Sequence, residues 1–277
     1  MNAINGKQTV RLLSTVLAFF LLAACTAPLG DPSTQMLVDS ARVALAPTGT
    51  LRAAINFGNP ILANKDAATG QAHGVSVDLA GELGKRLGVP VELVLYESAG
   101  KVVDGLKAGA WDIGFFAIDP VRATDIDFTS AYVVIEGAYL VPNDSAISVN
   151  DEVDQEGVRV VVGRGSAYDL YLTRELKRAK LVRAPTSPSV VDLMSSGKFE
   201  VAAGVKQQLE ADAKRLSGVR VLDGCFMVIN QAMATPKGRD VSGVAYLNAF
   251  VAEMKSSGFV TRALKLHGIE GATVAPL

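Results

Sequence analysis

The chain has 277 residues, of which 49% are hydrophobic and 20% charged, and its formal net charge is −1. This composition is typical of a globular protein, and the length allows one large domain or two smaller ones, each able to bury a core. The balanced charge excludes a strongly basic nucleic-acid binder, and we find no helix-turn-helix, zinc or RNA-binding motif. We therefore expect no nucleic-acid partner.

Residues 1–24 have the pattern of a secretory signal peptide. Lys7 and Arg11 form a basic segment, and a mainly apolar run follows over residues 12–24. That run is short for a membrane-spanning helix and has the length of a signal-peptide core. We expect the segment to be removed during export.

The apolar run ends in Leu22-Ala23-Ala24-Cys25, which resembles the bacterial lipobox, where the cysteine is lipidated and becomes the first residue. The alternative is an ordinary secretory signal in which Cys25 has no role. We expect lipidation at Cys25 and a protein in the periplasm that touches the membrane through its lipid anchor only. Residues 25–48 are rich in proline and small polar residues and are expected to form a tether, with a short helix near residues 35–45.

The following segment alternates strands with helices. Apolar residues recur four apart at Leu79, Leu83 and Leu87, which is typical of one face of a helix that ends at Gly88. Strands alternating with helices indicate an α/β fold with a mostly parallel sheet covered by helices. The predicted strands are 51–55, 91–96 and 111–118, and the predicted helices are 75–87 and 101–108.

The same alternation restarts after Pro142. Ser166 is predicted to cap a helix, since Asp169 follows three residues later. The predicted strands are 158–162, 181–184, 199–203 and 219–222, and the predicted helices begin at Ser166 and cover 189–196, 208–216, 241–256 and 260–267.

Two apolar strand-like stretches, 138–141 and 229–234, join the two series. If the C-terminal helices pack on the first series, the chain crosses twice between two lobes, which makes a hinge with a cleft. We expect lobe one to comprise 49–138 and 233–277, and lobe two, with the crossover strands, to comprise 139–232.

At this point the sequence resembles the periplasmic solute-binding proteins of polar amino-acid ABC importers, the extracellular family 3 group. The similar segments occur in the same order over about residues 49–268. They are Gly49-Thr50-Leu51-Arg52, Gly74-Val75-Ser76-Val77-Asp78-Leu79-Ala80, Leu106-Lys107-Ala108-Gly109-Ala110-Trp111-Asp112-Ile113, Asp119-Pro120-Val121-Arg122 with Ile126-Asp127-Phe128-Thr129, Val162-Gly163-Arg164-Gly165-Ser166 and Met254-Lys255-Ser256-Ser257-Gly258. The resemblance implies a type II periplasmic-binding-protein fold, with two α/β lobes joined by two crossover strands.

The resemblance also implies a carboxylate anchor. The family arginine matched by Arg122 holds the ligand's α-carboxylate, for which a planar guanidinium can donate two parallel hydrogen bonds. The alternative is a surface arginine that pairs with Asp119 or Asp125. Gly165, Ser166 and Ala167 lie at a predicted helix N-terminus, where free N–H groups favour an anion. Ser166 can cap this helix and contact the ligand at once.

Several positions depart from the family pattern. Val205 stands where the family places an acid for the ligand's ammonium, and Asn59 and Ala99 replace the usual aromatic residues. At two further positions the family has residues that carry a hydroxyl group, whereas this chain has Phe115 and Ala117. The carboxylate half of the site is therefore expected to be kept, and the ammonium half to be lost.

Other residues could replace the lost groups. Asn56 and Asn59 offer amide donors and acceptors on the first loop, and Phe115 or Tyr168 could supply a stacking face. Glu136 could receive a cation, although it could equally be a solvated acid at the end of a strand.

We interpret the chain as a solute receptor, not an enzyme, that delivers a small anionic or zwitterionic solute to an ABC permease in the inner membrane. We expect a monomer, with no cofactor and no metal. One alternative is an enzyme resembling periplasmic cyclohexadienyl dehydratases, with Glu136 as its acid. Another is a sensor or partner-presenting lipoprotein without a transport role.

Overall fold

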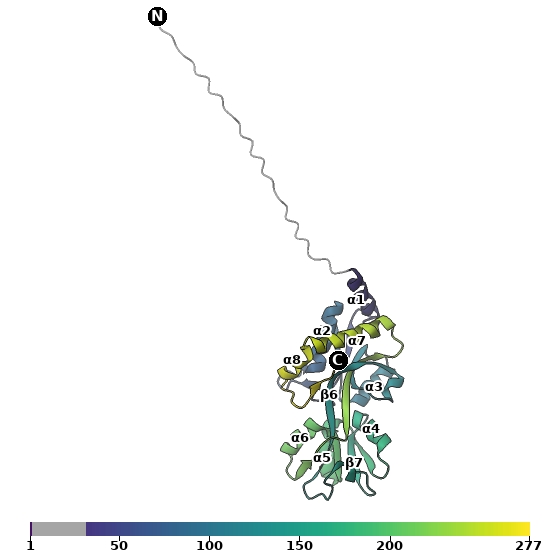
Figure 1. Ribbon diagram of the computed structural model, residues 1–277, viewed down its shortest axis with the longest axis vertical. Helices are drawn as coiled ribbons and strands as arrows, with labels where there is room; N and C mark the ends of the chain where they lie inside the picture. The colour runs from purple at the N-terminus through teal and green to yellow at the C-terminus, as the bar shows by residue number, and fades with distance from the viewer. Residues whose placement is uncertain (2–31) are drawn as a thin grey trace.

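A computed structural model describes Met1 and residues 32–277, which form an elongated body of two lobes, one above the other in Figure 1. The expected signal peptide and Cys25 lie outside the described residues. In the part of the chain that is described, no helix is long and apolar enough to cross a bilayer.

The first lobe, at the top of the body in Figure 1, is built around three parallel strands, with β1 between β4 and β5. Its C-terminal helices α7 and α8 lie against α1 and α2, so the end of the chain returns to this lobe. Its elements are α1 (Pro32–Leu45), β1 (Leu51–Asn56), β2 (Asn64–Lys65), β3 (Ala72–His73), α2 (Val75–Leu87), β4 (Val91–Tyr96), α3 (Ala99–Lys107), β5 (Ile113–Ala117), α7 (Val241–Ser256) and α8 (Phe259–Leu266).

The second lobe repeats this plan with β7 between β8 and β9, again parallel. Residues of β7 and β9 are fully buried, because helices cover both faces of the strands. Its elements are β7 (Arg159–Gly163), α4 (Ala167–Glu175), β8 (Lys180–Ala184), α5 (Val190–Gly197), β9 (Val201–Val205), α6 (Lys206–Arg215) and β10 (Val219–Val221), with the short 3-10 helices η2 (Asn150–Glu152) and η3 (Ser187–Ser189).

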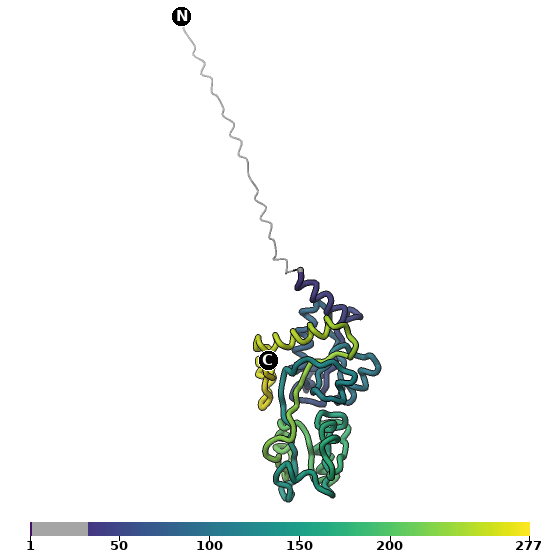
Figure 2. The backbone as a smooth tube through the Cα atoms, turned by 45° about the vertical axis from the view of Figure 1, so that its right-hand side comes forward, coloured from purple at the N-terminus to yellow at the C-terminus, as the bar shows by residue number. Residues whose placement is uncertain are grey.

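Two long antiparallel strands, β6 (Ile126–Pro142) and β11 (Met227–Pro236), connect the lobes. β11 pairs with β5 in the first lobe and β6 pairs with β9 in the second, so one sheet runs through both lobes. The C-terminal strand β12 (Thr273–Val274) pairs with the middle of β6, and Figure 2 shows this segment turned back beside the crossover strands. The expected type II fold with two crossover strands is confirmed.

The N-terminal helix α1 differs from the expected tether. Ala41 and Leu45 are fully buried, and Arg42 donates a hydrogen bond to the Leu87 carbonyl at 2.6 Å. These buried residues and Ala44 lie in the C-terminal part of α1, which contacts α7 and α2. The short helix expected near residues 35–45 is present, but the prediction that the tether extends to residue 48 is wrong, because from Ala41 onward the chain packs on the first lobe.

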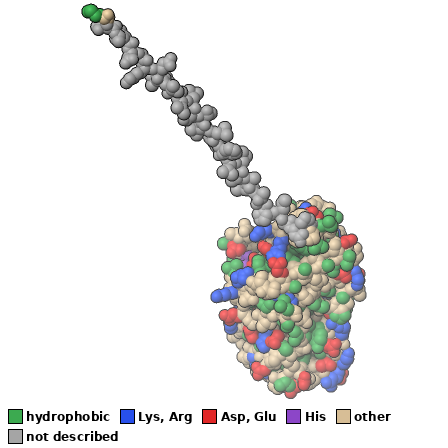
Figure 3. All heavy atoms as spheres, turned by 45° about the horizontal axis from the view of Figure 1, so that its top comes forward, with side chains coloured by type: hydrophobic (Ala, Val, Ile, Leu, Met, Phe, Trp, Pro, Cys, Tyr) green, Lys and Arg blue, Asp and Glu red, His purple; other side chains and the backbone are tan. Residues whose placement is uncertain are grey.

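The surface carries charges of both signs. On the face in Figure 3, Lys and Arg side chains alternate with Asp and Glu side chains, and neither sign forms a large patch. This face lacks the basic patch by which nucleic-acid-binding proteins are recognised.

Candidate functional site

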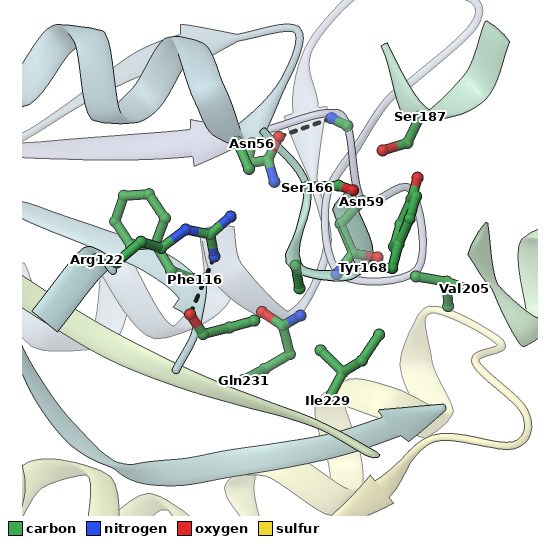
Figure 4. Close-up of a pocket in the computed structure, with 14 residues that line it drawn as sticks. Asn56, Asn59, Phe116, Arg122, Ser166, Tyr168, Ser187, Val205, Ile229 and Gln231 are labelled. Atoms are coloured by element: carbon green, nitrogen blue, oxygen red, sulfur yellow. Dashed lines mark hydrogen bonds between the residues drawn. The ribbon is translucent and has the colours of Figure 1, made fainter. Parts of the chain in front are cut away.

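A small cavity lies between the lobes, where the C-terminal end of β5 faces the N-terminus of α4. Its volume, taken as the space open to the centres of water molecules, is about 30 Å³. One water needs about 10–15 Å³ on this measure, so the cavity holds a molecule of a few non-hydrogen atoms. Fourteen residues line it, Asn56, Gly58, Asn59, Ala99, Phe116, Ala117 and Arg122 from the first lobe, Ser166, Ala167, Tyr168, Ser187 and Val205 from the second, and Ile229 and Gln231 from β11 (Figure 4).

Arg122 begins the 3-10 helix η1 (Arg122–Thr124) and is only 4% exposed. Its Nη1 donates to the Ala117 carbonyl at 3.0 Å, and its Nη2 donates across the cleft to the Gly165 carbonyl at 2.8 Å. Its Nε is buried without a partner, and no described carboxylate lies within 4.0 Å to form an ion pair. Burial lowers the pKa of Arg122 to about 10, so the guanidinium is still charged at neutral pH.

Asp119, the nearest candidate partner for Arg122, is committed elsewhere. Its Oδ2 accepts a hydrogen bond from Nη2 of Arg174, in the second lobe, at 2.9 Å. Its Oδ1 accepts one from the Val121 amide at 2.8 Å. The alternative that Arg122 is a surface arginine paired with Asp119 is therefore wrong, and the Asp119–Arg174 pair instead ties the two lobes together.

The N-terminus of α4 forms the second-lobe wall. Ser166 caps the helix as predicted, since its Oγ accepts from the Asp169 amide at 3.0 Å. The Asp169 carboxylate accepts from the Gly165 amide at 2.8 Å and pairs with Arg183 at 2.9 Å. Ala167 and Tyr168, in the first helical turn where amide groups lack helical partners, line the cavity.

Neutral polar groups surround the rest of the cavity. Asn56 accepts a hydrogen bond from the Gly58 amide at 2.9 Å, whereas the Oδ1 of Asn59, a residue 8% exposed, has no partner. Gln231, 7% exposed, extends from β11 into the same space (Figure 4). Burial raises the pKa of Tyr168 to about 12, so its hydroxyl stays neutral. These groups can orient a ligand by hydrogen bonds but cannot neutralise a charge.

Most of the sequence-predicted site residues meet at this cavity. Asn56, Asn59, Ala117, Arg122, Ser166, Ala167 and Tyr168 line it, and Gly165 contributes the carbonyl that accepts from Arg122.

Two predicted residues lie elsewhere. Phe115 packs in the hydrophobic core, with its ring edge-on to Tyr132 at a centroid distance of 6.2 Å, and Phe116 lines the cavity instead. The reason is that successive residues of a strand point to opposite faces of the sheet. Glu136 pairs with Lys206 at 3.1 Å and lines a separate groove. Of the two candidates for a stacking face, Tyr168 lines the cavity and Phe115 does not, and of the two roles left open for Glu136, the one in the site is wrong.

Sequence reasoning missed four further lining residues with side chains, Phe116, Ser187, Ile229 and Gln231. For Gln231 a signal existed, because Asn230 and Gln231 are polar residues within a mainly apolar crossover strand. Ser187 is the first residue of η3.

No group of three or more histidine, cysteine, aspartate or glutamate side chains in the described part of the chain could hold a metal ion. The charged and polar groups of the cavity wall are one guanidinium among amides and hydroxyls.

Solved structures with the same fold are numerous. The chain is similar to the ancestral amino acid-binding protein AncCDT-1, a precursor of cyclohexadienyl dehydratase, with 26% identity, a TM-score of 0.67, and coverage of 80% of this chain and 96% of the other. It shares the fold of the solute receptor for L-cysteine of Neisseria gonorrhoeae, with 24% identity, a TM-score of 0.71, and coverage of 84% and 94%. It also shares the fold of a binding component of an ABC transporter from Wolinella succinogenes complexed with lysine, with 24% identity, a TM-score of 0.68, and coverage of 79% and 95%.

No curated protein matches the sequence. The family model of the bacterial extracellular solute-binding proteins, family 3, matches residues 51–267. That match covers both lobes, both crossover strands and every residue of the cavity wall. The chain therefore belongs to the bacterial extracellular solute-binding proteins, family 3.

Proposed function

We propose that this protein is a lipid-anchored receptor that captures a small carboxylate-bearing solute in the cavity between its lobes and presents it to an ABC permease. The observation that carries the proposal is the buried, charged and ion-pair-free guanidinium of Arg122. A buried charge without a counter-ion costs several kcal/mol, and a carboxylate in the cavity would remove that cost.

The N–H groups of Arg122 that do not yet donate a hydrogen bond are suited to a carboxylate. A guanidinium has five N–H donors, of which two are used on the Ala117 and Gly165 carbonyls. Nη1 and Nη2 each keep a second N–H, so the pair can still donate to the two oxygens of one carboxylate. The ring of Phe116, with its centroid 5.6 Å from the guanidinium carbon, supports the same group from the side.

Capture requires the lobes to open and close. The cavity is lined by both lobes, which are joined through β6 and β11, so bending at these strands would widen it to admit a solute and narrow it again around the solute. We propose residues 49–138 and 233–277, extended by α1, as one rigid unit and residues 139–232 as the other. Closure would then bury most of a small solute.

The anchor is part of the proposal. Residues 26–31 separate Cys25 from Pro32, and a chain of that length reaches at most about 25 Å. Lipidation at Cys25 would therefore keep the first lobe close to the membrane and to a permease. Changing Cys25→Ser should move the protein from the membrane fraction to the soluble periplasmic fraction, and a wild-type protein found only in the soluble fraction would contradict the lipid anchor.

The binding function is tested by a thermal-shift screen of short carboxylates, 2-oxo acids, hydroxy acids, amino acids and neutral amides, followed by calorimetric titration of those that stabilise the protein. Arg122→Ala should weaken binding of the best solute by about 2–5 kcal/mol, because the solute's charge then lacks its partner. The exposed Arg178 offers a matched control, since Arg178→Ala removes an arginine outside the cavity. Equal losses in both variants, or none in either, would refute the assignment of Arg122.

The alternative function, an enzyme resembling cyclohexadienyl dehydratases, requires an acid in the cleft, and its candidate was Glu136. Glu136 lies outside the cavity in a pair with Lys206, and none of the fourteen lining residues is an aspartate or glutamate. A dehydratase that expels water with an acid in the cleft has no such acid here, so binding is the function that the geometry supports best.

A further inference from the structure

We infer that the solute is a short monocarboxylate with a neutral hydroxyl and no ammonium group, so that its net charge is −1. This inference rests on the proposed function, because it assumes that the cavity around Arg122 is the binding site. It departs from amino-acid binding, and it follows from the charges, the volume and the unpaired polar atoms of this cavity.

The charge balance of the cavity favours a monoanion. Of the fourteen lining residues, Arg122 is the one that is charged at neutral pH, so the empty wall carries a formal charge of +1. A monoanion brings the closed cavity to zero. A zwitterionic amino acid leaves it at +1, with an ammonium and a guanidinium enclosed together and one carboxylate between them. Like charges at short range in a desolvated site are strongly unfavourable.

No nearby acid is free to receive an ammonium. Asp119 pairs with Arg174, and Asp169 pairs with Arg183, each at 2.9 Å. Asp212 lines a smaller cavity that shares Val205 and Tyr168 with the first, but it pairs with Arg215 at 2.9 Å and also accepts from the Gln208 amide. Recruiting any of them would break an existing pair.

The wall where the family places its acid is apolar. Val205, the last residue of β9, is 8% exposed and lines the cavity together with Ile229 of β11 (Figure 4). Ala99 and Ala117 add only methyl groups. An ammonium against this surface would lose its hydration, and the neutral amide oxygens elsewhere in the cavity could accept a hydrogen bond from it but could not balance its charge, whereas a methyl group of the solute would gain apolar contact.

A hydroxyl fits the unpaired polar groups. Asn59 is more than nine-tenths buried, lines the cavity, and its Oδ1 accepts no hydrogen bond. A solute hydroxyl can donate to such an oxygen and accept from a side-chain amide such as that of Gln231, which an ether or a halide cannot do. The cavity has about 30 Å³ open to the centres of water molecules, so we choose the small hydroxy acids glycolate and lactate as probes.

Two matched pairs of probes test the inference, glycolate against glycine and L-lactate against L-alanine, because each pair differs only in a hydroxyl replacing an ammonium. Calorimetric titration at pH 7.5 should give dissociation constants at least tenfold lower for the hydroxy acids. An amino acid that binds as tightly as its hydroxy acid, or the failure of both hydroxy acids to bind, would overturn the inference. In that case the proposed function would still hold if another carboxylate bound in a way that depends on Arg122. It would be refuted if no carboxylate of the wider screen bound.

Val205 allows a charge-swap test. In Val205→Asp, a carboxylate on the apolar wall should raise the affinity for L-alanine relative to L-lactate at least tenfold, while Val205→Asn, of the same size and uncharged, should leave the ratio near that of wild type. The ratio of two affinities in one variant does not depend on how much of that variant is folded. An unchanged ratio in Val205→Asp, or equal changes in both variants, would show that Val205 does not face the solute's second substituent.

Discussion

The ion pair between Asp119 and Arg174 should control how tightly the solute is held, although neither residue lines the cavity. The pair joins the two lobes at 2.9 Å, so it exists only while the cleft is closed. Its side chains are 4% and 35% exposed, which places it between a surface pair, worth about 0.2–1 kcal/mol, and a buried pair, whose disruption costs about 3–5 kcal/mol. We take about 1–2 kcal/mol for its contribution to closure, or a factor of roughly 5–30 in affinity.

Arg174→Ala should therefore raise the dissociation constant of the solute by about 5–30-fold, while the melting temperature of the unliganded protein stays unchanged. Arg174→Lys keeps the charge and serves as the control. A double-mutant cycle with Asp119→Asn, which retains an oxygen to accept from the Val121 amide, isolates the pair itself. Calorimetric titration of the four proteins gives the coupling, and a coupling energy near zero would refute the role of this pair in closure.

Three further outcomes are expected. Gly165 has φ +69°, and an added Cβ would lie 2.8 Å from the Cα of Gly100 in the opposite lobe, so Gly165→Ala should prevent full closure and weaken binding more than tenfold, measured by calorimetry. Leu45→Ala should lower the stability by about 2–5 kcal/mol in denaturant titrations, because Leu45 is fully buried, whereas Val43→Ala, at a site 73% exposed, should change it little. Solute affinity should be constant between pH 6 and 9 and fall above about 10, because burial lowers the pKa of Arg122 to about 10 and only the protonated guanidinium attracts an anion. Intact binding by Gly165→Ala would contradict the predicted clash with Gly100. Equal losses of stability in Leu45→Ala and Val43→Ala would contradict the packing of α1. Solute affinity that rose above pH 10 would contradict the role of the Arg122 charge.

The helices and strands were predictable because their signals are local. The four-residue spacing of Leu79, Leu83 and Leu87 and the glycine that follows determine where α2 packs and where it ends. The expected order of strands and helices is found in both lobes. The crossover strands were predicted too short, because β6 continues through polar positions such as Asp127 and Glu136 whose partners come from distant parts of the chain.

The candidate site was predictable at residues whose side chains have one characteristic role. Arg122 was expected because the segment Asp119-Pro120-Val121-Arg122 resembles the family's, and Ser166 because of the chemistry of a helix N-terminus. Phe115 could not be distinguished from Phe116, because both faces of β5 are buried and a continuous apolar run does not say which face borders the cleft. The partner of Glu136, Lys206, lies 70 residues away, and that contact depends on the pairing of β6 with β9, which places Gly137 beside Val205.

The position of α1 could not be derived for a similar reason. Ala41 and Ala44 are small residues that would fit equally well in a polar tether. They are buried because α1 contacts α7 and α2, which the sequence of this segment does not show. A helix this short is marginal alone and owes its stability to packing, which periodicity within one segment does not reveal.

The central claim is that the cleft holds a small anion on Arg122, and native mass spectrometry of protein purified from its own host without unfolding tests it most directly. We predict one equivalent of a retained solute that is a short monocarboxylate without an amino group, lost when the lobes are unfolded and absent from Arg122→Ala purified in parallel. A retained α-amino acid, or the same solute retained by both proteins, would contradict the account.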